Sequence, residues 1–169
     1  MNSTLAGLLN VICTWLEQTP LSQTIQATDW IVPTVQTVHI LAIAVVAGSA
    51  LMIDLRLIGM FGADQPLKNV SSRFLPFVWW PLLILLATGA IMIIGEPSRS
   101  LKNPAFQLKM SLLVAAVFIT GLFQFLLRHD PAFGEPGSKR RRAAATIAVL
   151  SLLLWSGIIF AGRWIAYYS

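Results

Sequence analysis

The sequence predicts an all-α integral membrane protein: a four-helix bundle preceded by an amphipathic helix at the membrane surface. Two of the supporting observations are compositional. Of the 169 residues 56% are hydrophobic, and only 11% are charged, against about 25% in soluble globular proteins. The third is that four apolar segments are long enough to cross a hydrocarbon core of about 30 Å, which takes about 20 residues. A water-soluble fold of this size is excluded, because it could not bury so much apolar surface.

The first 30 residues form a separate N-terminal segment, and residues 31–169 form the bundle. Within residues 4–17 the apolar side chains recur at helical spacing, as in Leu5, Leu8, Ile12 and Trp15. This pattern predicts an amphipathic helix that lies flat in the membrane interface. A signal peptide is not expected, because the segment has no basic residue and its apolar positions are interrupted by polar ones.

Four spans are expected over about residues 33–60, 74–94, 104–128 and 143–167. Pro33 suits the first turn of the first span, and Pro81 should bend the entry half of the second. Asn103 and Pro104 are a helix cap and a first-turn residue for the third. The connections are short, so consecutive helices should be antiparallel neighbours.

The basic residues predict the orientation of the bundle. Eight of the twelve flank the loops that join the first span to the second and the third to the fourth: Arg56, Lys68, Arg73, Arg128 and the KRRR run at 139–142. The first 30 residues carry none. The positive-inside rule therefore predicts two cytoplasmic basic loops and two periplasmic termini.

The residues near the membrane surfaces fit this orientation. The KRRR run beside a span indicates contact with lipid headgroups, and nucleic acid is not expected as a partner. An aromatic belt at the periplasmic surface is expected from Trp30, Trp164, Tyr167 and Tyr168.

His39 is one of only two histidines and is expected about 10 Å below the periplasmic surface. Ionisable groups at such a depth are costly, usually face the bundle interior, and mark functional sites. Ala42, Val46 and Ala50 share its helix face, and the two alanines predict a hollow beneath the imidazole that would admit a flat macrocycle. His39 is therefore the candidate metal ligand. A structural hydrogen bond to a neighbouring helix and a role in proton transfer stay open.

Lys109 enters the membrane from the same side and reaches a similar depth, so we expect it near His39. The alternative is that its side chain extends to the outer headgroups. Four further charged residues gather at this end: Glu96, Arg99, Lys102 and Arg163. They are candidates to hold carboxylates such as haem propionates, or Glu96 pairs with Arg163.

The second histidine, His129, belongs to the opposite end. It is expected to be a solvated loop residue, about 20–25 Å from His39 along the membrane normal, and the two cannot ligate one haem. Asp54 and Arg56 lie near the same end but are two positions apart, so they do not face each other. Arg56 is a candidate to bind phosphate headgroups, and Asp54 to pair with Arg73 or to mark a proton exit. The single cysteine, Cys13, excludes an internal disulfide.

Three stretches carry a resemblance to known families: AGSALMIDLRLIG, NPAFQLKM and LLLWSGIIFAGRWIAYY. The chain resembles a family of small bacterial four-helix membrane proteins known only as a domain of unknown function. Its first span, with His39, Gly48 and Arg56 followed by leucine, is also similar to the membrane protoporphyrinogen oxidase family, which binds haem b, and to the copper-resistance D membrane proteins.

The second resemblance implies that His39 is a haem ligand and that Lys109, in KMSL, is an essential neighbour. The chain departs from the oxidase pattern in two places. The tryptophan that usually comes shortly before the glycine is absent, with Val46 and Ala47 preceding Gly48, and a second membrane-embedded histidine is missing. These departures favour haem binding over porphyrinogen oxidation.

The sequence thus predicts a bacterial inner-membrane protein that binds haem b and passes electrons between a periplasmic donor and the quinone pool. The expected cofactor contacts are His39, Lys109, Ala42, Val46, Ala50 and Arg163. The alternative is a non-enzymatic accessory or anchoring subunit of a larger membrane complex; a small-ion transporter is a weaker third. Expected partners are membrane lipids, a redox or complex partner, and a second copy of the chain.

Overall fold

The computed structural model describes residues 3–62, 64–130, 132–135, 137–138 and 140–167. Within this part the secondary structure is helical throughout, with no strand, and four helices are long and apolar enough to cross a membrane. The predicted all-α fold class is therefore confirmed. The helices are α1 (Ser3–Glu17), α2 (Pro20–Ala27), α3 (Ile31–Ile58), α4 (Leu67–Phe74), α5 (Pro76–Gly95), α6 (Pro97–Leu101), α7 (Pro104–His129) and α8 (Arg141–Trp164), followed by a 3₁₀ turn at Ile165–Tyr167.

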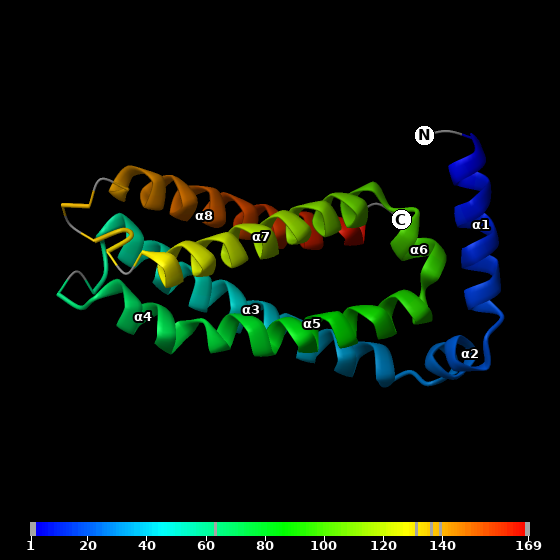
Figure 1. The fold of residues 1–169 in the computed structure, drawn as a ribbon. Helices are drawn as coiled ribbons and strands as arrows, with labels where there is room; N and C mark the ends of the chain where they lie inside the picture. Colours follow the sequence, from blue (N-terminus) through cyan, green and yellow to red (C-terminus); the bar gives the residue numbers. More distant parts are fainter. Residues whose placement is uncertain (1–2, 63, 131, 136, 139, 168–169) are drawn as a thin grey trace.

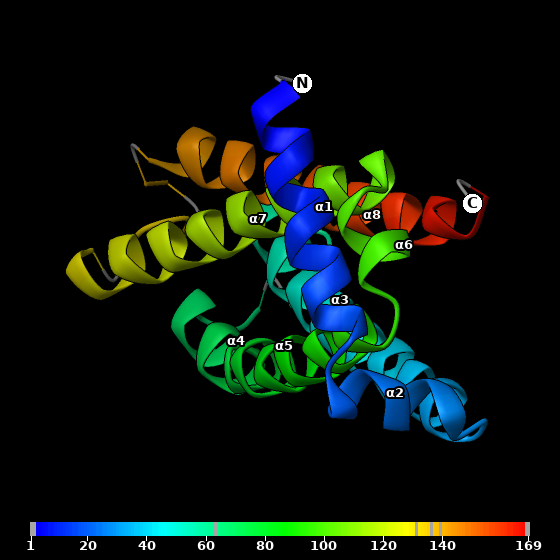
Figure 2. The same cartoon turned by 90° about the vertical axis from the view of Figure 1, so that its right-hand side faces the viewer.

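The long helices form two pairs. α3 packs along α5 and α7 along α8, and the contact between α3 and α8 joins the pairs (Figure 1). The described residues of the loops at 59–62, 64–66, 132–135, 137–138 and 140 make up one end of the bundle, here called the basic end. At the other end, here called the α1 end, lie α1, α2, α6 and the 3₁₀ turn. Figure 2 shows α1 lying across this end.

The helix boundaries follow local sequence signals. α3 stops at Gly59, whose φ of 89° lies in the left-handed region that only glycine adopts freely. At the start of α7 the side chain of Asn103 accepts a hydrogen bond from the Ala105 amide at 2.9 Å, and Pro104 follows in the first turn, as expected. The α4 helix was not expected, because Leu67–Phe74 is largely polar and gives no membrane-span signal.

The N-terminal segment is two helices instead of one. Pro20 starts α2, and the Thr19 side chain caps it by accepting from the Ser22 amide. α2 is tied to the end of α5: Ser22 Oγ donates to the Ile94 carbonyl at 2.7 Å, and Gln26 Nε2 donates to the Gly95 carbonyl at 2.9 Å. These bonds satisfy carbonyls in the last turn of α5, which have no partner within that helix.

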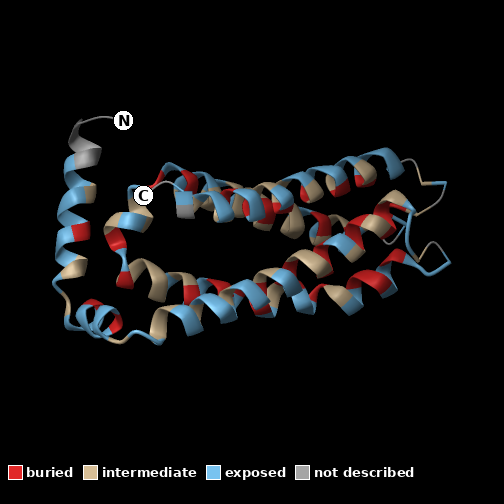
Figure 3. Ribbon diagram, turned by 180° about the vertical axis from the view of Figure 1, so that it is seen from behind, coloured by how far each residue is buried: buried red, intermediate tan, exposed pale blue. Residues whose placement is uncertain are grey.

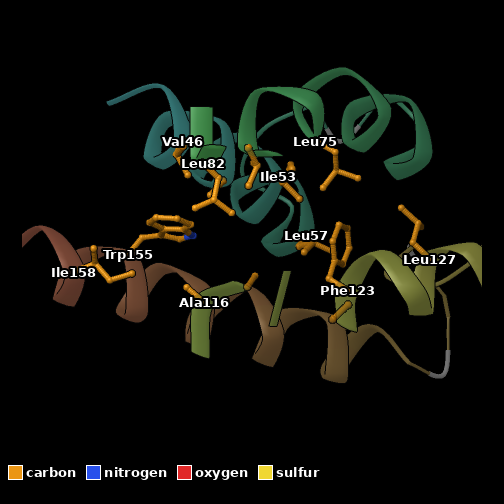
Figure 4. Packing of buried hydrophobic residues seen from close by; sticks show 14 of the residues in the cluster. Val46, Ile53, Leu57, Leu75, Leu82, Ala116, Phe123, Leu127, Trp155 and Ile158 are labelled. Carbon is orange, nitrogen blue, oxygen red and sulfur yellow. The ribbon is translucent and has the colours of Figure 1, made fainter. Parts of the chain in front are cut away.

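The core lies between the two helix pairs (Figure 4), where Val46, Leu82, Phe123 and Trp155 belong to one packed cluster. The outward faces are largely exposed along the whole bundle (Figure 3). They carry large apolar side chains such as Trp80, Phe118 and Leu153, which are 72%, 69% and 64% exposed. Apolar outer faces over a small buried core are typical of helices that pack in lipid.

Candidate functional site

The candidate site joins three helices in the half of the bundle nearest α1. His39 of α3 places its Nδ1 2.7 Å from Thr88 Oγ1 of α5 and its Nε2 3.4 Å from Lys109 Nζ of α7. The structure therefore brings together the two residues that the sequence placed at similar depth. Thr88 was missed, because one hydroxyl within an apolar helix gives no distinct signal.

The hydrogen bonds of Thr88 assign the protonation pattern of the His39 ring. Thr88 Oγ1 donates its hydrogen to the Ile84 carbonyl at 2.6 Å, so it can only accept from His39 Nδ1–H. The lone pair of the neutral imidazole is then on Nε2, which faces Lys109. At 3.4 Å the contact between Nε2 and Nζ is long for a hydrogen bond.

Glycines border both side chains. A Cβ on Gly89 of α5 would lie 3.7 Å from His39 Cε1, and a Cβ on Gly162 of α8 would lie 3.8 Å from the Lys109 side chain. The imidazole and the amine therefore each have bare backbone on one side.

The hollow expected beneath His39 is not seen. Ala42 and Val46 are 6% and 0% exposed and belong to the packed core, and Trp155 of α8 projects toward Val46 (Figure 4). An indole from a helix more than a hundred residues away cannot be foreseen from the α3 pattern. Ala50 does line a cavity, but one of only about 20 Å³. The Trp155 Nε1 atom is buried and has no hydrogen-bond partner among the described residues.

Arg163 does not join the site. Its side chain is exposed, and its guanidinium carbon lies 5.9 Å from the centre of the Tyr167 ring. The expected pairing of Glu96 with Arg163 is wrong, since Glu96 bonds Arg99 on the neighbouring helical turn at 2.9 Å. Both partners of that pair are about half exposed, so it contributes little to stability.

The second histidine is remote from the first, as expected. His129 is exposed in the last turn of α7, where its Nδ1 lies 2.9 Å from the Phe125 carbonyl. It is 20 residues beyond Lys109 on that helix, about 30 Å at 1.5 Å per residue.

At the basic end the structure corrects two expectations. Arg56 does not reach for headgroups: it is 3% exposed and donates to the Gln65 carbonyl and to Glu135 Oε2, the latter at 3.0 Å. Asp54 is buried and forms no ion pair with any described residue, while Arg73 is exposed. Glu135 also accepts from the Leu67 amide at 2.6 Å. Its role was missed because 79 residues separate it from Arg56.

The expected surface residues are placed as far as the structure describes them. Trp30, Trp164 and Tyr167 are exposed at the α1 end, at 67%, 44% and 68%. Lys139 of the KRRR run and Tyr168 lie outside the described residues.

Nowhere in the described chain do three or more His, Cys, Asp or Glu side chains gather as a metal-binding group would. The metal-ligating candidate is thus His39 by itself. A single imidazole is the usual protein contribution to an iron already held by four macrocycle nitrogens.

Comparison with known proteins gives one match. Neither a curated protein nor a solved structure matches the chain. The model of a family of unknown function, DUF6644, matches residues 12–168. The match covers nearly the whole chain, all four long helices included, and the protein therefore belongs to the DUF6644 family.

Proposed function

We propose that this protein is a bacterial inner-membrane protein that binds haem b through His39 and transfers electrons between a periplasmic donor and the quinone pool. The basic end would face the cytoplasm and the α1 end the periplasm, because Arg140, Arg141 and Arg142 stand beside the start of α8. His39 then lies in the periplasmic half of the membrane, within reach of both partners.

One observation carries the proposal: Thr88 accepts the Nδ1 hydrogen of His39, and the Nε2 lone pair is turned into the bundle. Metal-ligating histidines almost always donate their other ring N–H to such an acceptor, which fixes the tautomer and the ring orientation. Within the protein Nε2 has only a long contact, 3.4 Å to Lys109 Nζ. The donor set therefore fits an axial ligand of haem iron.

Other residues of the site fit the same group. Lys109 faces Nε2 and would help to hold the haem, as a second ligand or by bonding a propionate carboxylate. Gly89 and Gly162 let the imidazole and the amine pack directly against helix backbone. Trp155 Nε1 is a buried donor without an acceptor among the described residues, and an added group could supply one.

Haem b would supply one-electron transfer. The chain's own residues would bind and orient it: Thr88 holds the imidazole, and Lys109 places a donor opposite it. His39 and Lys109 are both half-buried, and burial is one of the means by which a protein sets a haem potential.

The test is the absorption spectrum of the protein purified in detergent from cells with sufficient haem. We expect a Soret band in the wild type and its loss in His39→Ala. His129→Ala is the matched control, because that exposed histidine lies at the other end of α7; it should keep the band. A colourless, iron-free wild type would overturn the proposal and leave the accessory subunit, which should then co-purify with a stable partner.

A further inference from the structure

Asp54 is a buried carboxyl that the proposed haem site does not use. It is 4% exposed and lies four residues before the end of α3, about 6 Å along the axis from the basic end of that helix. Its Oδ2 atom is buried and has no hydrogen-bond partner among the described residues. Such an atom in a packed core calls for an explanation, often an ordered water.

A cavity lies beside this carboxyl. It has a volume of about 20 Å³ and is lined by Asp54 of α3, Thr120 of α7 and Ser151 of α8, among apolar neighbours. A cavity of about 10–15 Å³ already holds one water molecule, provided two to four polar groups surround it. Thr120 Oγ1 donates to the Ala116 carbonyl at 2.9 Å, so its lone pairs are free to accept from such a water.

The charged residues near Asp54 provide no cationic partner for its carboxyl group. No other ionisable side chain lines the cavity: Val78 faces it from α5, Ile119 and Phe123 from α7, and Ile147 from α8. Arg56 is engaged by Glu135, and Lys68 and Arg73 of α4 are exposed. The Ser151 side chain hydrogen-bonds Asp54, but an ionised carboxylate without a cation is still disfavoured in such surroundings, whereas a neutral carboxyl that bonds a water is not.

We propose that Asp54 and one water molecule, held by Thr120 and Ser151, form a proton-binding site near the basic end of the bundle. On release the Asp54 O–H bond breaks, the electron pair stays on the carboxylate, and the proton passes to the bound water, which gives one of its own protons to bulk water at the basic end; uptake is the reverse. The proposal stands independently of haem, since it uses no residue of the His39 site.

Infrared spectroscopy of the protein in lipid vesicles at pH 7 tests the proposal. We expect a carbonyl band of a protonated carboxyl that shifts in D₂O, moves again when aspartate carries ¹³C in its carboxyl group, and is absent in Asp54→Asn. Glu135→Gln is the control that should keep the band. Thr120→Val should keep it too but slow its shift in D₂O, because the water loses a partner.

Three results would overturn the site: no such band in the wild type, a band that persists in Asp54→Asn, or a band insensitive to ¹³C-aspartate. The isotope measurement needs no variant, so it decides the matter even if Asp54→Asn does not fold. A fourth contrary result would come from thermal unfolding in sodium and in choline salts. If the wild type melts at a higher temperature in sodium than in choline, and Asp54→Asn melts at the same temperature in both, the cavity binds a cation and not a proton. A colourless preparation that shows the band would remove the haem proposal and keep this one.

Discussion

A single hydroxyl determines how the imidazole of His39 is presented. Thr88 donates to its own helix and accepts from His39, so it joins α5 to α3 and turns Nε2 toward Lys109. The sequence predicted that His39 and Lys109 lie close together, because both enter from one side to similar depth. It could not predict Thr88, which lies 49 residues from His39 and looks like any small residue in a span.

Removing the Thr88 hydroxyl should weaken the proposed haem binding while leaving the His39 imidazole in place. Thr88→Val keeps the shape of the side chain and loses the acceptor for Nδ1–H. Loss of such a partner typically lowers metal affinity about 10- to 100-fold, and we expect a fall of that order when haem is titrated into the apoprotein. Thr88→Ser keeps the hydroxyl and should bind as the wild type does. Equal affinities in all three proteins would contradict the role assigned to Thr88.

At the basic end, substitution of Glu135 should lower the free energy of unfolding most. Glu135 bonds both the buried Arg56 side chain and the Leu67 amide, and it is itself 27% exposed. Breaking a fully buried ion pair costs about 3–5 kcal/mol; with this partial exposure we expect Glu135→Gln to lower the unfolding free energy by about 2–3 kcal/mol. Chemical unfolding in detergent measures this free energy. Glu96→Gln, from an exposed pair, should change it by less than about 1 kcal/mol.

The helices themselves were largely predictable, and the departures have local causes. Hydropathy predicted four long apolar helices, since lipid requires them, and four such helices are found among the described residues. It missed α4, which is polar on one side, and α2, which is short and starts at Pro20. Both are stabilised by contacts with other elements: α4 by packing on α3 and α5, and α2 by bonds to the carbonyls that end α5.

The seating of α2 on α5 leads to a prediction about the single cysteine. A Cβ on Gly95 would lie 2.9 Å from Ile25 Cγ2, so Gly95→Val should push α2 away from the end of α5. Cys13 of α1 is 1% exposed, and we expect its labelling by a maleimide to speed up several-fold once the N-terminal helices loosen. Gly48→Val is the control, because no atom lies within 4 Å of a Cβ there. An unchanged labelling rate in Gly95→Val would show that α1 is held independently of α2.

In the whole molecule, polar side chains of the membrane-length helices form two groups. These two groups are His39, Thr88 and Lys109 in the half nearest α1, and Asp54, Thr120 and Ser151 in the half nearest the basic end; other polar residues of the same helices, such as the buried Ser49, belong to neither. The sequence predicted that Lys109 would lie near His39, but it predicted neither Thr88 nor the residues that surround Asp54. Partners depend on how the helix pairs rotate against each other, and a single sequence carries no record of that rotation.

The orientation of the whole molecule in the membrane is a further prediction. When the four long helices span the membrane, the His39 site and the Asp54 site lie in different halves of it. In a Cys13→Ser background, Gln18→Cys at the α1 end and Asp64→Cys at the basic end are both exposed positions. With two periplasmic termini, a membrane-impermeant maleimide should label residue 18 in intact spheroplasts and residue 64 only after lysis. The reverse order would place His39 in the cytoplasmic half. A periplasmic donor could then no longer reach it, and the Asp54 site would exchange its proton with the periplasm instead.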